Sequence, residues 1–87
     1  MSVTVYSREN CVQCKQTYMF LDKFGIDYSR IDIDQDKNAA AVIDKYDFQS
    51  APVVIVENSD GDNTVSDAWC GFRIDKIKEL QKASVNA

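Results

Sequence analysis

The sequence predicts an α/β fold in which a four-stranded mixed sheet is flanked by three helices, in the order β-α-β-α-β-β-α. Three observations lead to this prediction: short β-branched runs recur along the chain, helical segments with apolar faces separate the first three of them, and an Asp-Gly pair marks a hairpin before the last. A chain of 87 residues can form one hydrophobic core. We therefore expect a single domain over residues 1–83 and a frayed tail over residues 84–87.

The first strand is predicted in the run "SVTVYS", where Val3, Val5 and, less cleanly, Ser7 alternate with Thr4 and Tyr6. A helix follows from about Asn10, the expected N-cap, to Gly25, which supplies the stop. The apolar residues of this helix recur at steps of four and three, so they share one face. These residues are Cys14, Tyr18, Leu21 and Phe24.

The middle of the chain predicts a second strand and a second helix. The strand lies within Asp27–Asp34, a run rich in Tyr and Ile that ends in acidic residues. The Ala-rich segment Gln35–Phe48 then predicts a helix, with Asp34 or Asp36 near its positive end.

The last third of the chain predicts a hairpin and a closing helix. Pro52–Glu57 is a continuous apolar strand, Asp60-Gly61 marks the turn, and "TVSDAW" is the return strand. A final helix is expected from about Phe72 to Lys82. The residues expected to face inward are Ile74, Ile77 and Leu80. Two parallel strands joined by a helical crossover, then a hairpin and a helix, form the smallest version of the thioredoxin-like fold.

Composition excludes several classes of protein. The net charge is −4 and Lys and Arg form no cluster, so no nucleic-acid partner is expected. No apolar run approaches the roughly 20 residues that span a bilayer, and the N-terminus lacks the pattern of a leader. We therefore expect a cytoplasmic monomer without a membrane anchor. In that reducing compartment, three cysteines indicate chemistry rather than a disulfide scaffold.

Cys11 and Cys14 lie at the predicted junction between the first strand and its helix. Free backbone N–H groups and the positive end of the helix dipole favour a thiolate there, so Cys11 is expected to be the acidic thiol. Its attack on a partner's disulfide would give a mixed disulfide, which Cys14 would resolve by closing the 11–14 bond.

Two other interpretations of the pair remain open. Structural zinc would need four ligands, and the chain contains no His and only Cys70 besides the pair, so no metal is expected. The two cysteines could instead serve as small buried hydrophobic residues. Redox pairs occur at strand–turn–helix junctions, which favours the redox interpretation.

Two further segments contain candidate partner-binding residues. Pro52, the only proline, opens a buried strand, and a cis Ala51-Pro52 bond would expose the Ala51 backbone to an incoming chain. In "DAWCGFRID", Gly71 suits a tight turn from strand to helix. Trp69 is expected to pack in the core, whereas core packing and partner docking are equal alternatives for Phe72.

Together these residues resemble the NrdH-redoxin family, the glutaredoxin-like electron donors of class Ib ribonucleotide reductase. The resemblance runs from "VTVYS" through "CVQC" and "APVV" to "WCGFR" and Asp75. It implies a nucleophilic Cys11, a resolving Cys14 and a cis-proline loop. The partner-binding residues that it implies are Val12, Gln13, Ala51, Pro52, Trp69, Gly71, Phe72 and Arg73. The chain departs from the family's "WSGFRPD" segment at Cys70 and Ile74.

By this resemblance, the protein donates electrons to the large subunit of class Ib ribonucleotide reductase. The resemblance also implies that thioredoxin reductase reduces it in turn, so NADPH is expected to be used indirectly, with no cofactor bound. A glutathione-dependent glutaredoxin is the alternative, although "CVQC" replaces the "CPYC" that is frequent there. A carrier of an iron–sulfur cluster or zinc, using Cys11 with Cys70, is the non-enzymatic alternative.

Overall fold

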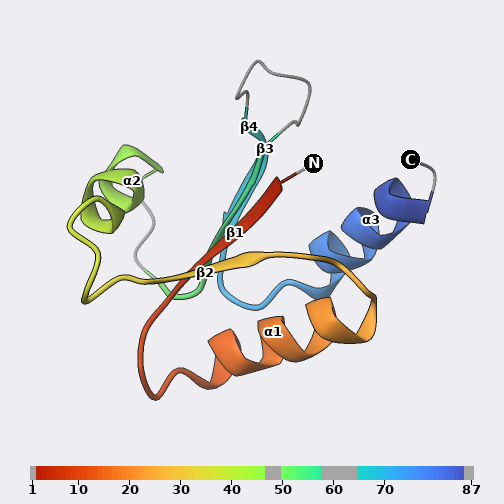
Figure 1. Ribbon diagram of the computed structural model, residues 1–87, viewed down its shortest axis with the longest axis horizontal. Helices are drawn as coiled ribbons and strands as arrows, with labels where there is room; N and C mark the ends of the chain where they lie inside the picture. The colour runs from red at the N-terminus through yellow and green to blue at the C-terminus, as the bar shows by residue number, and fades with distance from the viewer. Residues whose placement is uncertain (1, 47–49, 58–64, 86–87) are drawn as a thin grey trace.

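The computed structural model describes residues 2–46, 50–57 and 65–85. Its four strands form one mixed sheet in the order β2-β1-β3-β4, with β1 parallel to β2 and the other neighbours antiparallel. Helices α1 and α3 lie on one side of the sheet and α2 on the other (Figure 1). This is the predicted thioredoxin-like arrangement. The elements are β1 Ser2–Ser7, α1 Val12–Lys23, β2 Ser29–Asp32, α2 Ala39–Tyr46, β3 Val53–Glu57, β4 Val65–Cys70 and α3 Ile74–Val85.

The strand β3 lies between β1 and β4 and is buried on both faces, as its continuous apolar run predicts. Val54 and Val56 belong to the core cluster that includes residues of α1 and α3. Because side chains alternate along a strand, Val53 and Ile55 point to the opposite face, and both are at most 3% exposed. The sheet therefore holds α1 and α3 through one set of valines and leaves a second apolar face toward α2.

The buried face of α1 contains Cys14, Tyr18 and Leu21, as predicted, and also Thr17, which was not predicted. Phe24, the fourth residue expected on this face, is only partly buried against the core. The helix ends at Lys23 with Phe24 as its C-cap, and Gly25 follows with a φ of +70°, as the stop signal predicts. The expected N-cap was wrong, because Cys11 caps the helix. Asn10 instead has a φ of +58°, a left-handed conformation that Asn tolerates better than most residues, and it forms the turn before the cap.

The helix α2 is shorter than predicted and begins at Ala39. The acidic residues before it bond to turns instead of the helix: Asp32 Oδ1 accepts the Asp34 N–H at 2.8 Å, and Asp36 Oδ1 accepts the Asn38 N–H at 2.8 Å. The first turn of α2 contains no acidic residue, because the helix begins at Ala39. Asp36 lies just before that start, near the positive end as expected, whereas Asp34 lies further from it.

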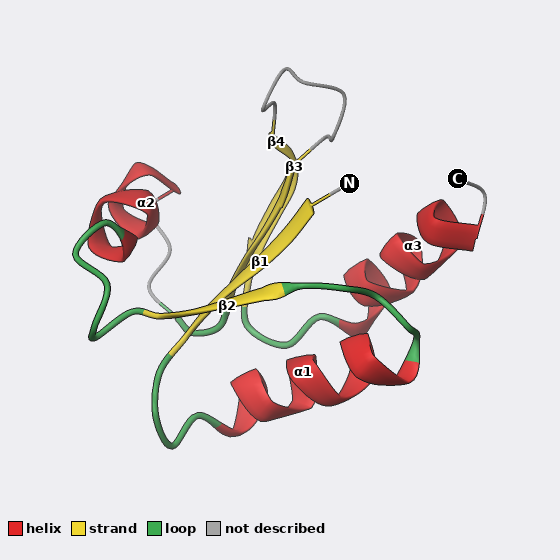
Figure 2. Ribbon diagram, viewed as in Figure 1, coloured by secondary structure: helices red, strands yellow, loops and turns green. Residues whose placement is uncertain are grey.

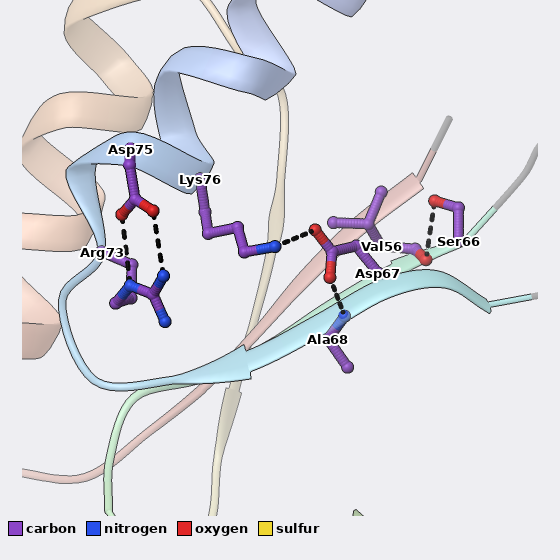
Figure 3. Close-up of polar contacts among 7 residues, drawn as sticks. All are labelled: Val56, Ser66, Asp67, Ala68, Arg73, Asp75 and Lys76. Atoms are coloured by element: carbon purple, nitrogen blue, oxygen red, sulfur yellow. Dashed lines mark hydrogen bonds and ion pairs between the residues drawn. The ribbon is translucent and has the colours of Figure 1, made fainter.

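The strand β4 pairs with β3 as predicted, whereas the turn expected at Asp60-Gly61 lies outside the described residues. Asp67 of β4 forms an ion pair with Lys76 of α3, with Nζ and Oδ2 3.1 Å apart (Figure 3). Both side chains are about one-third exposed or less. This pair connects the edge strand to the first turns of α3, which follows the sheet in the chain.

The helix α3 is longer than predicted, because it extends to Val85 instead of ending near Lys82. Residues 84 and 85, which were expected in the frayed tail, are helical. No Gly or Pro interrupts the segment, so nothing in the sequence ends the helix earlier. Ile77 and Leu80 are buried as predicted, and Ile74 is half-buried. None of the helices in the described ranges (Figure 2) has the length and apolar character needed to cross a bilayer.

Replacing Leu21 by Ala tests the predicted face of α1. Leu21 is fully buried, so Leu21→Ala removes contacts at the centre of the core and should lower the free energy of unfolding by about 3 kcal/mol. Met19 lies on the same helix but is 59% exposed, so Met19→Ala should change that free energy by less than about 0.5 kcal/mol. Urea denaturation of both variants measures the difference, and equal losses would contradict the assigned face.

Candidate redox site

Cys11 and Cys14 form a disulfide at the start of α1, with their Cα atoms 5.2 Å apart. Cys11 has an extended backbone (φ −103°, ψ 107°) and is the N-cap residue. Its Sγ accepts the Cys14 N–H at 3.1 Å, which is the place that a Ser or Asp oxygen occupies in an ordinary cap. Cys11 is half-buried, whereas Cys14 is 1% exposed. A partner can therefore reach the first sulfur more easily than the second.

The surroundings of Cys11 favour a negative charge on its sulfur. The first turn of α1 contains no acidic side chain, and its N–H groups point toward the cap. A hydrogen bond from the Cys14 N–H stabilises a thiolate more than a thiol. Once the disulfide is reduced, this arrangement can hold Cys11 as the more reactive sulfur.

Backbone N–H donors connect the loop before β3 and the turn after β4 to the cysteine loop, residues 11–14 at the start of α1. The Ala51-Pro52 bond is cis, as expected from the fold. The Pro52 carbonyl oxygen accepts the Gly71 N–H at 2.8 Å, and the next N–H, that of Phe72, donates to Gln13 Oε1 at 3.0 Å. Gly71 has a φ of +80°, a conformation that favours glycine, which explains why this turn needs that residue. Hydrogen bonds therefore connect the three segments, although Pro52 itself is fully buried.

The remaining candidate residues divide between surface and core. Val12 is 69% exposed, and Gln13 and Arg73 are also exposed. Trp69 is 3% exposed and belongs to the core, as expected. Phe72 is half-buried, packs against the core and lies 5.4 Å from the Phe20 ring, measured between centroids. Phe72 therefore packs on the fold with one side and leaves the other open.

Arg73 and Asp75 form a two-bonded pair at the start of α3 (Figure 3). Arg73 Nε and Nη2 donate to the two carboxylate oxygens of Asp75 at 3.2 and 2.9 Å. These hydrogen bonds lower the pKa of the Asp75 carboxyl and raise that of the Arg73 guanidinium. The carboxylate also lies in the first turn of the helix, where the dipole favours a negative charge.

Cys70 is not part of the disulfide and is half-buried. It follows Trp69 on β4, and Trp69 belongs to the same core cluster as Cys14. Since neighbouring side chains on a strand point to opposite faces, Cys70 points to the face away from that cluster. Within the described ranges, no group of three or more Cys, Asp or Glu residues is arranged to hold a metal ion.

A cavity of about 200 Å³ beside the disulfide was not predicted from the sequence. Cys11 and Cys14 line it together with charged residues from the loop after β1, from α1 and from β2. The Arg30 guanidinium lies 4.0 Å from the centre of the Tyr18 ring, which also stacks on Tyr28. Only the position of Tyr18, one turn after Cys14, could have indicated this cavity. The other lining residues are Ser7, Arg8, Glu9, Asn10, Lys15 and Asp32.

A disulfide at a helix N-terminus, beside a cis-proline loop in a thioredoxin-like fold, defines a thiol–disulfide redox protein. The glutaredoxin family model matches residues 3–60. Over 83 residues the chain is 36% identical to the glutaredoxin-like protein NrdH of Escherichia coli strain K12, covering 95% of this chain and 93% of that protein. It is 31% identical over 78 residues to NrdH of Lactococcus lactis subsp. cremoris, covering 90% and 97%.

Solved structures agree with these matches. The NrdH-redoxin of E. coli superposes with a TM-score of 0.79 at 34% identity, covering 92% of this chain and 95% of that one. The thioredoxin-like protein BC3987 gives a TM-score of 0.73 at 26% identity, covering 91% and 99%. The chain therefore belongs to the glutaredoxin family, among its NrdH-type members.

Single cysteine replacements test the difference between the two sulfurs. Because Cys11 is accessible and capped by an N–H, Cys14→Ser should still attack a partner disulfide and should accumulate as a mixed disulfide through Cys11. Cys11→Ser should form no such adduct and should lose disulfide reduction. Mass spectrometry after mixing each reduced variant with a disulfide peptide measures the adducts. Cys70→Ser is the control and should behave like the unchanged protein, whereas an adduct in Cys11→Ser through Cys14 would reverse the assignment.

Proposed function

We propose that the protein carries two electrons from thioredoxin reductase, which is itself reduced by NADPH, to a disulfide of the large subunit of class Ib ribonucleotide reductase. The observation that supports this most strongly is the Cys11–Cys14 disulfide, with one accessible and one buried sulfur, in a chain 36% identical to an NrdH protein over 95% of its length. The resemblance of the Trp69–Arg73 segment to that family supports the choice of partner.

The reaction starts from the reduced protein. The Cys11 thiolate attacks one sulfur of the partner's disulfide, that S–S bond breaks, and the released partner thiolate takes up a proton. Cys14 then loses its proton and attacks the Cys11 sulfur, which forms the 11–14 bond and releases the second partner thiolate, and this thiolate also takes up a proton. The partner gains two electrons and two protons, and the protein is left oxidised, as in the structure described above.

The route of reduction separates this proposal from its main alternative. The published structure of the E. coli relative is described as explaining a thioredoxin-like activity profile for a glutaredoxin-like protein, which supports thioredoxin reductase as the electron source here. The family model that matches the chain is that of glutaredoxins, so a glutathione-dependent disulfide reductase is the second candidate. NADPH would act only through the reductase, with no cofactor bound to the protein.

The protein would work as a monomer in the cytoplasm, where thiols are kept reduced. Its partners would be the reductase and the ribonucleotide reductase subunit, with neither nucleic acid nor membrane involved. The net charge of −4 agrees with the absence of a nucleic-acid partner.

A coupled assay tests the electron source. The oxidised protein is given NADPH with either thioredoxin reductase or glutathione and glutathione reductase, and ribonucleotide reductase as the acceptor, while absorbance follows the loss of NADPH. We expect turnover with thioredoxin reductase and little with glutathione, and none with Cys11→Ser under either condition. Turnover with glutathione alone would establish the glutaredoxin alternative. Bound iron or zinc at stoichiometric amounts in the purified protein would support the carrier instead.

A further inference from the structure

The side chain of Gln13 connects the cysteine loop to a segment far away in the chain. Its Oε1 accepts the Phe72 N–H at 3.0 Å, across 59 residues of sequence. Gln13 lies between the two cysteines and is exposed to solvent. The disulfide does not need this contact, because Cys11 is capped by the Cys14 N–H. The hydrogen bond between Gln13 and Phe72 therefore has a role other than capping α1.

The surrounding backbone is arranged to make this bond. Gly71 turns the chain after β4 with a φ of +80° and gives its own N–H to Pro52, which leaves the Phe72 N–H directed at Gln13. A Cβ at position 71 would lie 3.3 Å from Gln13 Oε1, closer than ordinary van der Waals contact, so the glycine also makes room for the amide. On the other side, Thr17 Oγ1 donates to the Gln13 carbonyl oxygen at 2.9 Å and fixes its backbone.

This bond determines the orientation of the amide group. A backbone N–H can only donate, so the Gln13 oxygen faces Phe72 and the Nε2 group faces away. Gln13 is exposed, and its two Nε2 N–H donors have no hydrogen-bond partner among the residues that the structure describes. A backbone carbonyl of an extended chain that crosses the site is a suitable acceptor for them.

We propose that Gln13 is a positioning residue for polypeptide disulfides: its oxygen holds the Phe72 turn beside the Cys11–Cys14 bond, and its amide nitrogen donates to the backbone of the incoming chain. The inference rests on the proposed function as a reductant of protein disulfides and adds how such a substrate is recognised. A small disulfide, which needs only the accessible Cys11 sulfur, does not require Gln13.

The test compares a large and a small disulfide without either physiological partner. The protein is reduced with dithiothreitol, freed of it, and mixed with insulin or with the small chromogenic disulfide DTNB. Gln13→Met keeps the length of the side chain but removes both hydrogen-bonding functions. We expect it to react about tenfold more slowly with insulin, the scale of one lost hydrogen bond, and with DTNB at the unchanged rate. Gln16→Met, one turn further along α1, is the matched control and should alter neither rate.

A second variant separates the two functions of the amide. Gln13→Glu retains an acceptor for the Phe72 N–H but offers no donor to the substrate. Hydrogen exchange of the Phe72 amide, followed by NMR, should be faster in Gln13→Met than in the unchanged protein and should remain slow in Gln13→Glu. Both variants should lose reactivity with insulin.

Each contrary result overturns the proposal. Equal losses with insulin and DTNB would place the effect on the cysteines themselves, an unchanged rate with insulin would remove the substrate contact, and unchanged exchange in Gln13→Met would remove the link to Phe72. Because neither reductase takes part, these outcomes do not depend on which enzyme donates or accepts electrons in the coupled assay. If the unchanged protein reduces DTNB but not insulin, the proposed recognition of polypeptides is wrong.

Discussion

The cap of α1 is the constraint on which the rest of the structure depends. Between Ser7 and Val12 the chain must leave β1, turn, and begin a helix with two sulfurs within bonding distance. Asn10 makes the turn in a left-handed conformation, and Cys11 then satisfies a helical N–H with sulfur where other proteins use oxygen. The accessible sulfur and the helix cap are therefore the same atom, and a change that moves the start of α1 also moves the redox bond.

The end of β4 adds a second constraint. Because β3 and β4 are antiparallel neighbours, the last residues of β4 lie beside the first residues of β3, in the register of Val53 with Cys70. Two successive N–H groups, those of Gly71 and Phe72, then bond to Pro52 and to the cysteine loop. Strand order thus brings the Ala51-Pro52 loop and the Gly71-Phe72 turn close to the cysteine loop, and these hydrogen bonds hold them there. Neither effect alone would connect the three segments.

The sequence predicts features that follow a repeating apolar pattern, and it does not predict features that depend on a single contact. Apolar periodicity identifies the strands and the buried face of α1, because burial repeats with the period of each element. The ends of elements depend on individual hydrogen bonds. The predicted Asn10 cap was wrong because Cys11 Sγ accepts the helical N–H. The predicted start of α2 was too early because the carboxylates of Asp32 and Asp36 bond to turns before the helix. The cavity beside the disulfide depends on Arg30 lying over Tyr18, and a contact between separate elements leaves no local pattern. The cysteine spacing and the proline loop were recognisable because their chemistry restricts the residues that can occupy them.

The two departures from the family's segment indicate which of its features the fold requires. Proline at the start of α3 would preset the helical backbone, yet the helix begins at Ile74 without it. The Arg73–Asp75 pair supplies a first-turn carboxylate that the helix dipole favours, so the start is stabilised in another way. Cys70 points away from the face that Trp69 shares with the buried sulfur, so the hydroxyl lost at this position does not adjoin the disulfide. Both departures lie outside the hydrogen-bonded connection between the proline loop and the cysteine loop, and the redox chemistry can therefore tolerate them.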